Sequence, residues 1–185
     1  GCMGSFYAQK ALGIESPRVG LLNNGAEDTK GDPLHREAHQ LLKRAAEQGT
    51  IHFVGNVEAK AIPFDVCDVL VCDGFTGNIL LKTVEGMGKF MIQTLKGILT
   101  ENAVTKIGAL TMRKQLKNMK SQFDTSEHGG APLLGISKPV IKAHGSSDAR
   151  AIMNAVRQAV AYTETGVTYD IAAHAGSLLQ KTPDT

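Results

Sequence analysis

Short apolar runs typical of β-strands alternate with amphipathic helical patterns in the N-terminal half, and this alternation is the strongest constraint on the fold. The runs are residues 18–23, 51–54 and 68–72, and the last two are too continuously apolar for a sheet with one face in water. The first intervening helix begins with Asp32 as its cap and stops at Gly49. Strands separated by helices favour right-handed crossovers, so the pattern predicts an α/β fold with a mostly parallel sheet.

The sequence after residue 76 is mainly helical. A long helix is predicted from Gly77 to about Leu99 and a second from about Thr105 to Phe123, so that residues 77–123 form a protruding helical pair. Farther along, short strands or extended segments are expected at 133–136 and 139–143, followed by helices from Ala149 to about Gly166 and after Tyr169. Four apolar side chains on one face of the second helix are interpreted as core: Met112, Leu116, Met119 and Phe123.

Composition, charge and cysteine content exclude several classes of protein. With 42% apolar and 21% charged residues, the chain is too apolar for disorder. A net charge of +2 and the absence of tryptophan argue against a nucleic-acid partner. Three cysteines without a CxxC pair fit a reducing, cytoplasmic setting, and no run reaches the ~20 residues of a membrane span. His35 and His39 are four residues apart but no third ligand has suitable spacing, so no metal is expected.

Three junctions share one design, in which a strand is followed by glycines and small polar residues and usually by a helix. They are residues 22–31, 72–78 and 142–148. Such loops meet at the carboxyl edge of a parallel sheet, where free N–H groups and helix dipoles favour an anion. Well-capped turns are the alternative, and Asp148 could itself occupy a helix N-terminus. The residues that are candidates for binding such an anion are Thr76, Gly77, Asn78, Lys82, Lys142, His144, Gly145, Ser146 and Ser147.

Two features of the C-terminal half leave alternatives open. His144, in the third junction, could donate to an oxyanion or protonate a leaving group, or it could be a structural histidine bonded to a carbonyl. The adjacent Gly129 and Gly130 either lie against a ligand or form a tight turn.

A cationic face with apolar residues inside it is predicted on the second helix of the pair. Opposite the core stripe lie Lys106, Arg113, Lys117 and Lys120, and Ile107 and Leu110 lie among them. Such a face suits an anionic membrane surface or an acidic protein partner, whereas a solvated face with a dimer contact is the alternative. The residues assigned to this contact are Ile98, Leu99, Ile107, Leu110, Arg113 and Lys114.

Six stretches occur in order along the chain: GSFYA at 4–8, LGIESPRVGLLN at 12–23, FVGNVE at 53–58, VCDGFTGN at 71–78, SEHGGAPLLG at 126–135 and IKAHGSS at 141–147. Together they resemble the bacterial phosphate acyltransferase family of phospholipid synthesis. The resemblance implies that residues 1–185 correspond to the C-terminal part of such an enzyme, whose members are nearly twice as long. It also implies a doubly wound α/β fold of the phosphotransacetylase and isocitrate dehydrogenase type, usually as a homodimer.

The same resemblance implies an activity without a cofactor. Acyl-acyl carrier protein and inorganic phosphate would give acyl phosphate, and peripheral membrane association would allow its transfer to a membrane glycerol-phosphate acyltransferase. We expect phosphate to attack the thioester directly, because it is already an anionic nucleophile at neutral pH. A non-catalytic module that binds acyl carrier protein or membrane, and a relative that acts on acyl-coenzyme A, are the alternatives.

The expected roles follow from these assignments. Catalysis is assigned to His144, Lys142 and Asn78. The pantetheine arm is expected beside Gly129 and Gly130. Phosphate binding is assigned to Gly145, Ser146, Ser147, Thr76, Gly77 and Lys82.

Overall fold

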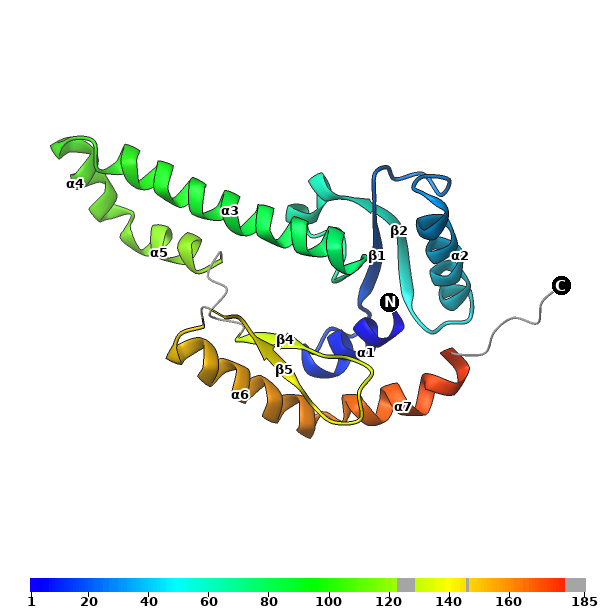
Figure 1. Cartoon of the computed structure of the whole chain (residues 1–185). Helices are drawn as coiled ribbons and strands as arrows, with labels where there is room; N and C mark the ends of the chain where they lie inside the picture. The colour runs from blue at the N-terminus through cyan, green and yellow to red at the C-terminus, as the bar shows by residue number, and fades with distance from the viewer. Residues whose placement is uncertain (123–128, 146, 179–185) are drawn as a thin grey trace.

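The computed structural model describes residues 1–122, 129–145 and 147–178. Helices and strands alternate through its N-terminal half, and helices dominate the remainder (Figure 1). The elements are α1 (Cys2–Ala11), β1 (Arg18–Asn23), α2 (Pro33–Glu47), β2 (His52–Glu58), η1 (Ala59–Phe64), β3 (Val69–Val71), α3 (Gly74–Leu99), α4 (Ala103–Thr111), α5 (Arg113–Gln122), β4 (Gly130–Pro132), β5 (Ile141–Ala143), α6 (Ala149–Glu164) and α7 (Val167–Leu178).

A three-stranded parallel sheet in the order β2-β1-β3 forms the centre of the N-terminal half. The middle strand is the most buried because it has a neighbour on each side, and Val19 and Leu21 have almost no exposed surface. Leu42 of α2 and Ile51 complete this core cluster. The sequence therefore correctly predicts an α/β chain with parallel strands. The expectation that the runs at 51–54 and 68–72 are covered on both faces is wrong, because Val54 is exposed and the residues of β3 are only half-buried.

A second core cluster joins the two ends of the chain. Tyr162 of α6 and Val167 and Ile171 of α7 pack against Phe6 and other residues of α1. The same helix α1 contributes Cys2 to the cluster around the sheet. Helix α1, which the sequence analysis did not predict, therefore connects the sheet to the α6–α7 layer.

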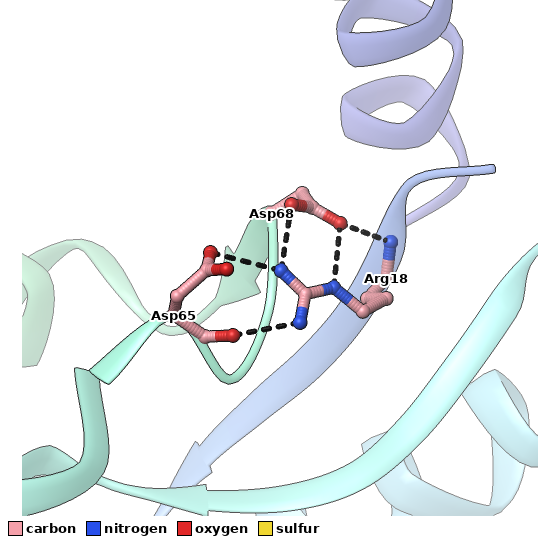
Figure 2. Close-up of polar contacts among 3 residues, drawn as sticks. All are labelled: Arg18, Asp65 and Asp68. Atoms are coloured by element: carbon pink, nitrogen blue, oxygen red, sulfur yellow. Dashed lines mark hydrogen bonds and ion pairs between the residues drawn. The ribbon is translucent and has the colours of Figure 1, made fainter. Parts of the chain in front are cut away.

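Arg18 ties the beginning of β1 to the segment that leads into β3 (Figure 2). Its guanidinium donates from Nε and Nη2 to the two carboxylate oxygens of Asp68, each at 3.0 Å, and its backbone N–H donates to the same carboxylate at 2.7 Å. Nη1 donates to the carbonyl oxygen of Asp65 at 2.7 Å and Nη2 to its carboxylate at 2.9 Å. These bonds lower the pKa of Asp68 to about 2. They hold β1 and β3 together at the amino edge of the sheet.

Helix α3 extends away from the sheet, α4 lies at its far end, and α5 leads back (Figure 1). Gly88 is the one buried residue of α3, and many apolar side chains of α3 and α4 are exposed. Among the described residues, no helix has both the length and the apolar character that a membrane span needs.

Several expectations need correction. The predicted second helix is two helices, α4 and α5, and the break lies at Met112, after the last residue of α4. Met112, assigned to the core, is half exposed because no other element of the described residues covers it, and Phe123 lies outside the described residues. Strands β4 and β5 form a separate antiparallel pair and are not part of the parallel sheet. The expected strand at 133–136 lies instead at Gly130–Pro132, and the long helix begins at Gly74.

Replacement of Asp68 by asparagine should lower stability in a pH-dependent way. The folded-state pKa of about 2 lies below the ordinary value of 3.8, so the stabilising contribution of the carboxylate is complete above about pH 4 and is lost as the pH falls toward 2. Urea unfolding followed by circular dichroism measures the free energy of unfolding. This free energy should be higher for wild type than for Asp68→Asn at neutral pH, and the difference between them should shrink in acid. Glu58→Gln, which removes a single exposed contact with Lys60, is the control. A difference in the free energy of unfolding between wild type and Asp68→Asn that does not change with pH would contradict this role of Asp68.

Candidate active site

Two of the three predicted junctions lie at the same edge of the parallel sheet. The loop at 24–31 follows β1, and residues 72–73 follow β3, which pairs directly with β1 in parallel register. Parallel neighbours place their carboxyl ends together, so these two loops are adjacent. The topology therefore confirms that the first two junctions are adjacent.

The third junction contacts α3, the helix that follows the second junction. It follows β5 of the antiparallel pair, so the expectation of one parallel edge for all three junctions is wrong for residues 142–148. However, Nε2 of His144 lies 3.3 Å from Nζ of Lys82 on α3, although 62 positions separate the two residues in sequence. This contact brings together two predicted site residues, one from helix α3 and one from the turn after β5.

The contact with Lys82 constrains the protonation of His144. A lysine ammonium has donors only, so Nε2 of His144 accepts this hydrogen bond and the proton of a neutral ring resides on Nδ1. His144 is exposed, and Nε2 can take up a proton from a bound group once Lys82 no longer donates to it. A role for Nε2 as donor or acid requires that it first receive a proton.

Glu85 is a third member of this cluster and was not among the predicted residues. Its Oε2 lies 2.9 Å from Nζ of Lys82, one helical turn away on α3. The hydrogen bond from Lys82 and the nearby positive charges hold the pKa of Glu85 below its usual value. Glu85 therefore stays ionised and holds the ammonium beside His144. The i,i+3 spacing of Lys82 and Glu85 on a predicted helix was the signal that could have identified it.

The helix N-termini near these loops are already occupied by aspartates. The carboxylate of Asp73 accepts from the backbone N–H groups of Phe75 and Thr76, both at 2.9 Å. Hydrogen bonds from the side chain and backbone of Thr76 hold the pKa of Asp73 below its usual value. Asp148 likewise caps α6 by accepting from Ala151 N–H at 2.8 Å. An anion at either helix terminus would face a carboxylate, so any attraction for an anion has to come mainly from side chains.

The glycines of the predicted site differ in how much space is open where a Cβ atom would lie. A Cβ at Gly77 would lie 2.8 Å from Sγ of Cys72, and one at Gly130 would lie 2.8 Å from the carbonyl oxygen of Lys142. Gly129 has a φ of +76° and lies directly against the backbone of α6 at Ala155. Close packing therefore explains these three glycines. At Gly145 a Cβ would meet no atom within 4 Å, so packing does not require glycine there.

The other predicted residues lie around the His144 turn and the start of α3. Ser147 donates its backbone N–H to the carbonyl oxygen of His144 at 3.0 Å and thereby closes the turn, whereas Ser146 lies outside the described residues. Lys142 and Asn78 are exposed. Lys142 lies two residues before His144, so the two share one face of the extended segment.

A nucleophilic Cys72 and a bound metal ion are two alternative sources of reactivity. Burial raises the pKa of the half-buried Cys72 thiol, with a further contribution from Asp73, so little of the nucleophilic thiolate is present at neutral pH. Within the described ranges, no three His, Cys, Asp or Glu residues are placed so that they could hold a metal ion. The chemistry of the described cluster is therefore that of a lysine, a glutamate and a histidine.

A three-stranded parallel sheet flanked by helices defines this chain as an α/β protein, and Lys82, Glu85 and His144 form one polar cluster. Residues 1–169 match the model of the family described as "Fatty acid synthesis protein", and the chain belongs to that family.

Curated relatives carry the name phosphate acyltransferase. The chain is 50% identical to that of Thermoanaerobacter pseudethanolicus over 89% of its own length and 48% of the relative. It is 52% identical to that of Caldanaerobacter subterraneus subsp. tengcongensis over 85% of its length and 46% of the relative. For Alkaliphilus oremlandii the identity is 48%, over 96% of this chain and 52% of the relative. The chain thus spans about half the length of the curated relatives it matches.

Alanine substitutions should separate the packed glycines from Gly145. Gly129→Ala should lower the free energy of unfolding by about 3 kcal/mol, because a positive φ and a backbone clash both oppose a side chain. Gly145→Ala should stay within about 0.5 kcal/mol of wild type. Urea unfolding followed by circular dichroism measures both. If Gly145→Ala destabilises as much as Gly129→Ala, Gly145 has a structural role.

Proposed function

We propose that this chain forms part of a phosphate acyltransferase that makes acyl phosphate from acyl-acyl carrier protein and inorganic phosphate. The single observation that carries the proposal is the Lys82–His144 contact, which supplies a cation and a proton acceptor at one place. The shared family and about 50% identity to phosphate acyltransferases support it. A doubly wound sheet of the phosphotransacetylase type in the whole protein is part of the same proposal.

Phosphate is the group that Lys82 would bind. The ammonium is held by Glu85 on one side and His144 on the other, and a phosphate dianion offers stronger hydrogen bonds than either. We assign the Gly145 turn, with Ser146 and Ser147, to the surrounding cradle, and Thr76, Gly77 and Asn78 to the start of α3. Since Gly145 has open space, a ligand can approach its backbone closely.

The reaction then follows from the protonation of His144. A phosphate oxygen attacks the thioester carbonyl carbon, and Nε2 of His144 takes the phosphate proton as the C–O bond forms. The tetrahedral intermediate collapses with cleavage of the C–S bond, and the protonated His144 returns the proton to the leaving sulfur. Lys82 and Lys142 would stabilise the developing negative charge. No covalent enzyme intermediate is required, and Gly129–Gly130 is where the pantetheine arm would pass.

Replacement of the two central residues should affect different constants. His144→Ala should lower kcat for phosphate-dependent thioester cleavage by about 100-fold, because it removes the proton carrier. Lys82→Met should raise the KM for phosphate by about tenfold, because it removes the main attraction for the anion. Lys96→Met, on the last turn of α3, is the matched control and should resemble wild type.

Two outcomes would change this proposal. Full turnover and unchanged phosphate affinity in His144→Ala would reject the assignment. If the intact chain binds acyl carrier protein without phosphate-dependent turnover, the alternative of a non-catalytic binding module is favoured. A substrate panel with acyl-coenzyme A distinguishes the related phosphotransacylase.

The exposed end of α3 and the helices that follow it support a peripheral membrane contact as part of the proposed function. Ile107 and Leu110 are 65% and 70% exposed. Exposed basic residues, Arg113 and Lys114, begin the next helix. Ile98 is exposed and Leu99 half-buried at the end of α3. Apolar side chains beside cations suit an anionic lipid surface. Exposed apolar residues along α3 also support a homodimer, and a membrane glycerol-phosphate acyltransferase would receive the product.

Vesicle sedimentation tests the membrane contact. Wild type should bind vesicles of phosphatidylglycerol more strongly than vesicles of phosphatidylcholine, and Ile107→Asp/Leu110→Asp should weaken the former by about tenfold, because two apolar side chains no longer insert. Phe64→Asp, an equally exposed apolar position on η1, is the control. Equal binding by the double variant and wild type would remove this surface from the proposal.

A further inference from the structure

The loop between β1 and α2 is anchored by a buried polar group that the proposed reaction does not use. His39 of α2 is 2% exposed, and its ring packs edge-on against Phe53 of β2 at 5.1 Å between centroids. Its Nδ1 lies 3.0 Å from Oδ1 of Asn56, which is also buried. Its Nε2 faces Oδ1 of Asp28, in the loop, at 3.5 Å. A buried histidine therefore lies between β2 and the loop.

The hydrogen bonds around Asn56 determine which ring nitrogen of His39 carries a proton. Nδ2 of Asn56 donates to the carbonyl oxygen of Glu27 at 2.7 Å, which fixes the orientation of the amide group. Oδ1 of Asn56 is then the atom that faces His39, and because it is an acceptor, Nδ1 of His39 must be the donor. In a neutral ring with this tautomer, Nε2 would present a lone pair to the carboxylate of Asp28.

A second proton on His39, carried by Nε2, removes the repulsion between the Nε2 lone pair and the carboxylate of Asp28. With both nitrogens protonated, Nδ1 donates to Asn56 and Nε2 forms an ion pair with Asp28. The charged groups around the ring are Asp28 of the loop and, on α2, Lys43 and Glu47, which line the same open pocket of about 400 Å³. Burial of the ring and the Lys43 ammonium disfavour the second proton, whereas the Asp28 carboxylate favours it. The ammonium of Lys43 is itself paired with the other oxygen of Asp28, which lies 3.6 Å from Nζ. From β2, the uncharged Asn56 and Phe53 face the ring.

We propose that doubly protonated His39 is a positioning residue that holds the loop at 24–31 against α2 and β2, and that loss of the Nε2 proton releases the Asp28 side of this loop. Two neutral anchors persist in both states, namely Asn56 to Glu27 and the side-chain amide of Asn23 to the carbonyl oxygen of Lys30 at 3.1 Å. The loop consequently loosens without leaving its place. The loop follows β1 and therefore lies at the carboxyl edge of the sheet. How tightly the loop is held at that edge consequently depends on pH. This inference goes beyond the proposed function, and its test needs no substrate.

Nuclear magnetic resonance of the intact ¹⁵N-labelled chain tests the protonation directly. Long-range correlations within the imidazole should show N–H character at both nitrogens of His39 in acid, and loss of the proton from Nε2 alone as the pH is raised. Amide hydrogen exchange at residues 27–30, after correction for the intrinsic pH dependence, should rise about fivefold across the same transition.

Variants around His39 keep the test independent of the packing of the ring. Asp28→Asn should abolish the pH transition in loop exchange, because the ion pair no longer forms. Lys43→Met leaves the His39–Asp28 contact in place and should retain the transition. His52→Gln, at an exposed position of β2, is the control and should also retain it. A ring that is protonated at Nε2 and bare at Nδ1, or an Asp28→Asn chain that keeps the transition, would overturn the proposal.

Discussion

The fork of hydrogen bonds from Arg18 determines where the loops of this protein can meet. It binds the beginning of β1 to Asp68, immediately before β3. The two strands therefore begin side by side and run in parallel. Because β3 has only three residues, its pairing with β1 offers few ladder hydrogen bonds of its own. The charge-assisted bonds at the amino edge compensate for this, and the loops after both strands consequently emerge together at the carboxyl edge.

A second long-range contact joins the remainder of the site to this framework. The β4–β5 pair is a separate sheet, and its packing partner is α6, so nothing in the parallel sheet itself places His144. The contact with Lys82 connects the turn after β5 to α3, and Glu85 orients the lysine from the same helix. The site therefore combines a rigid helix with a short turn, and its positive charge comes from side chains because aspartates occupy the helix N-termini.

Much of the fold could be predicted because the determining patterns are local. The apolar run at Arg18–Asn23 and the Asp32 cap before Pro33 predict a strand and the start of a helix without any tertiary information. Helix α1 was missed because its apolar residues face two different cores and show no single stripe. Met112 was misassigned because a helical face shows which residues lie together but not whether another element covers them.

The sequence by itself determined the alternation of parallel strands and helices, the aspartate caps and the presence of glycine-rich turns, since each depends on neighbours within a few residues. Only the tertiary structure decided which glycines are required by packing, as at Gly129, and which have open space, as at Gly145. It also decided that Lys82, Glu85 and His144 form one cluster and that His39 faces Asp28. Distances between residues far apart in sequence depend on how whole elements pack, and no local pattern encodes that packing.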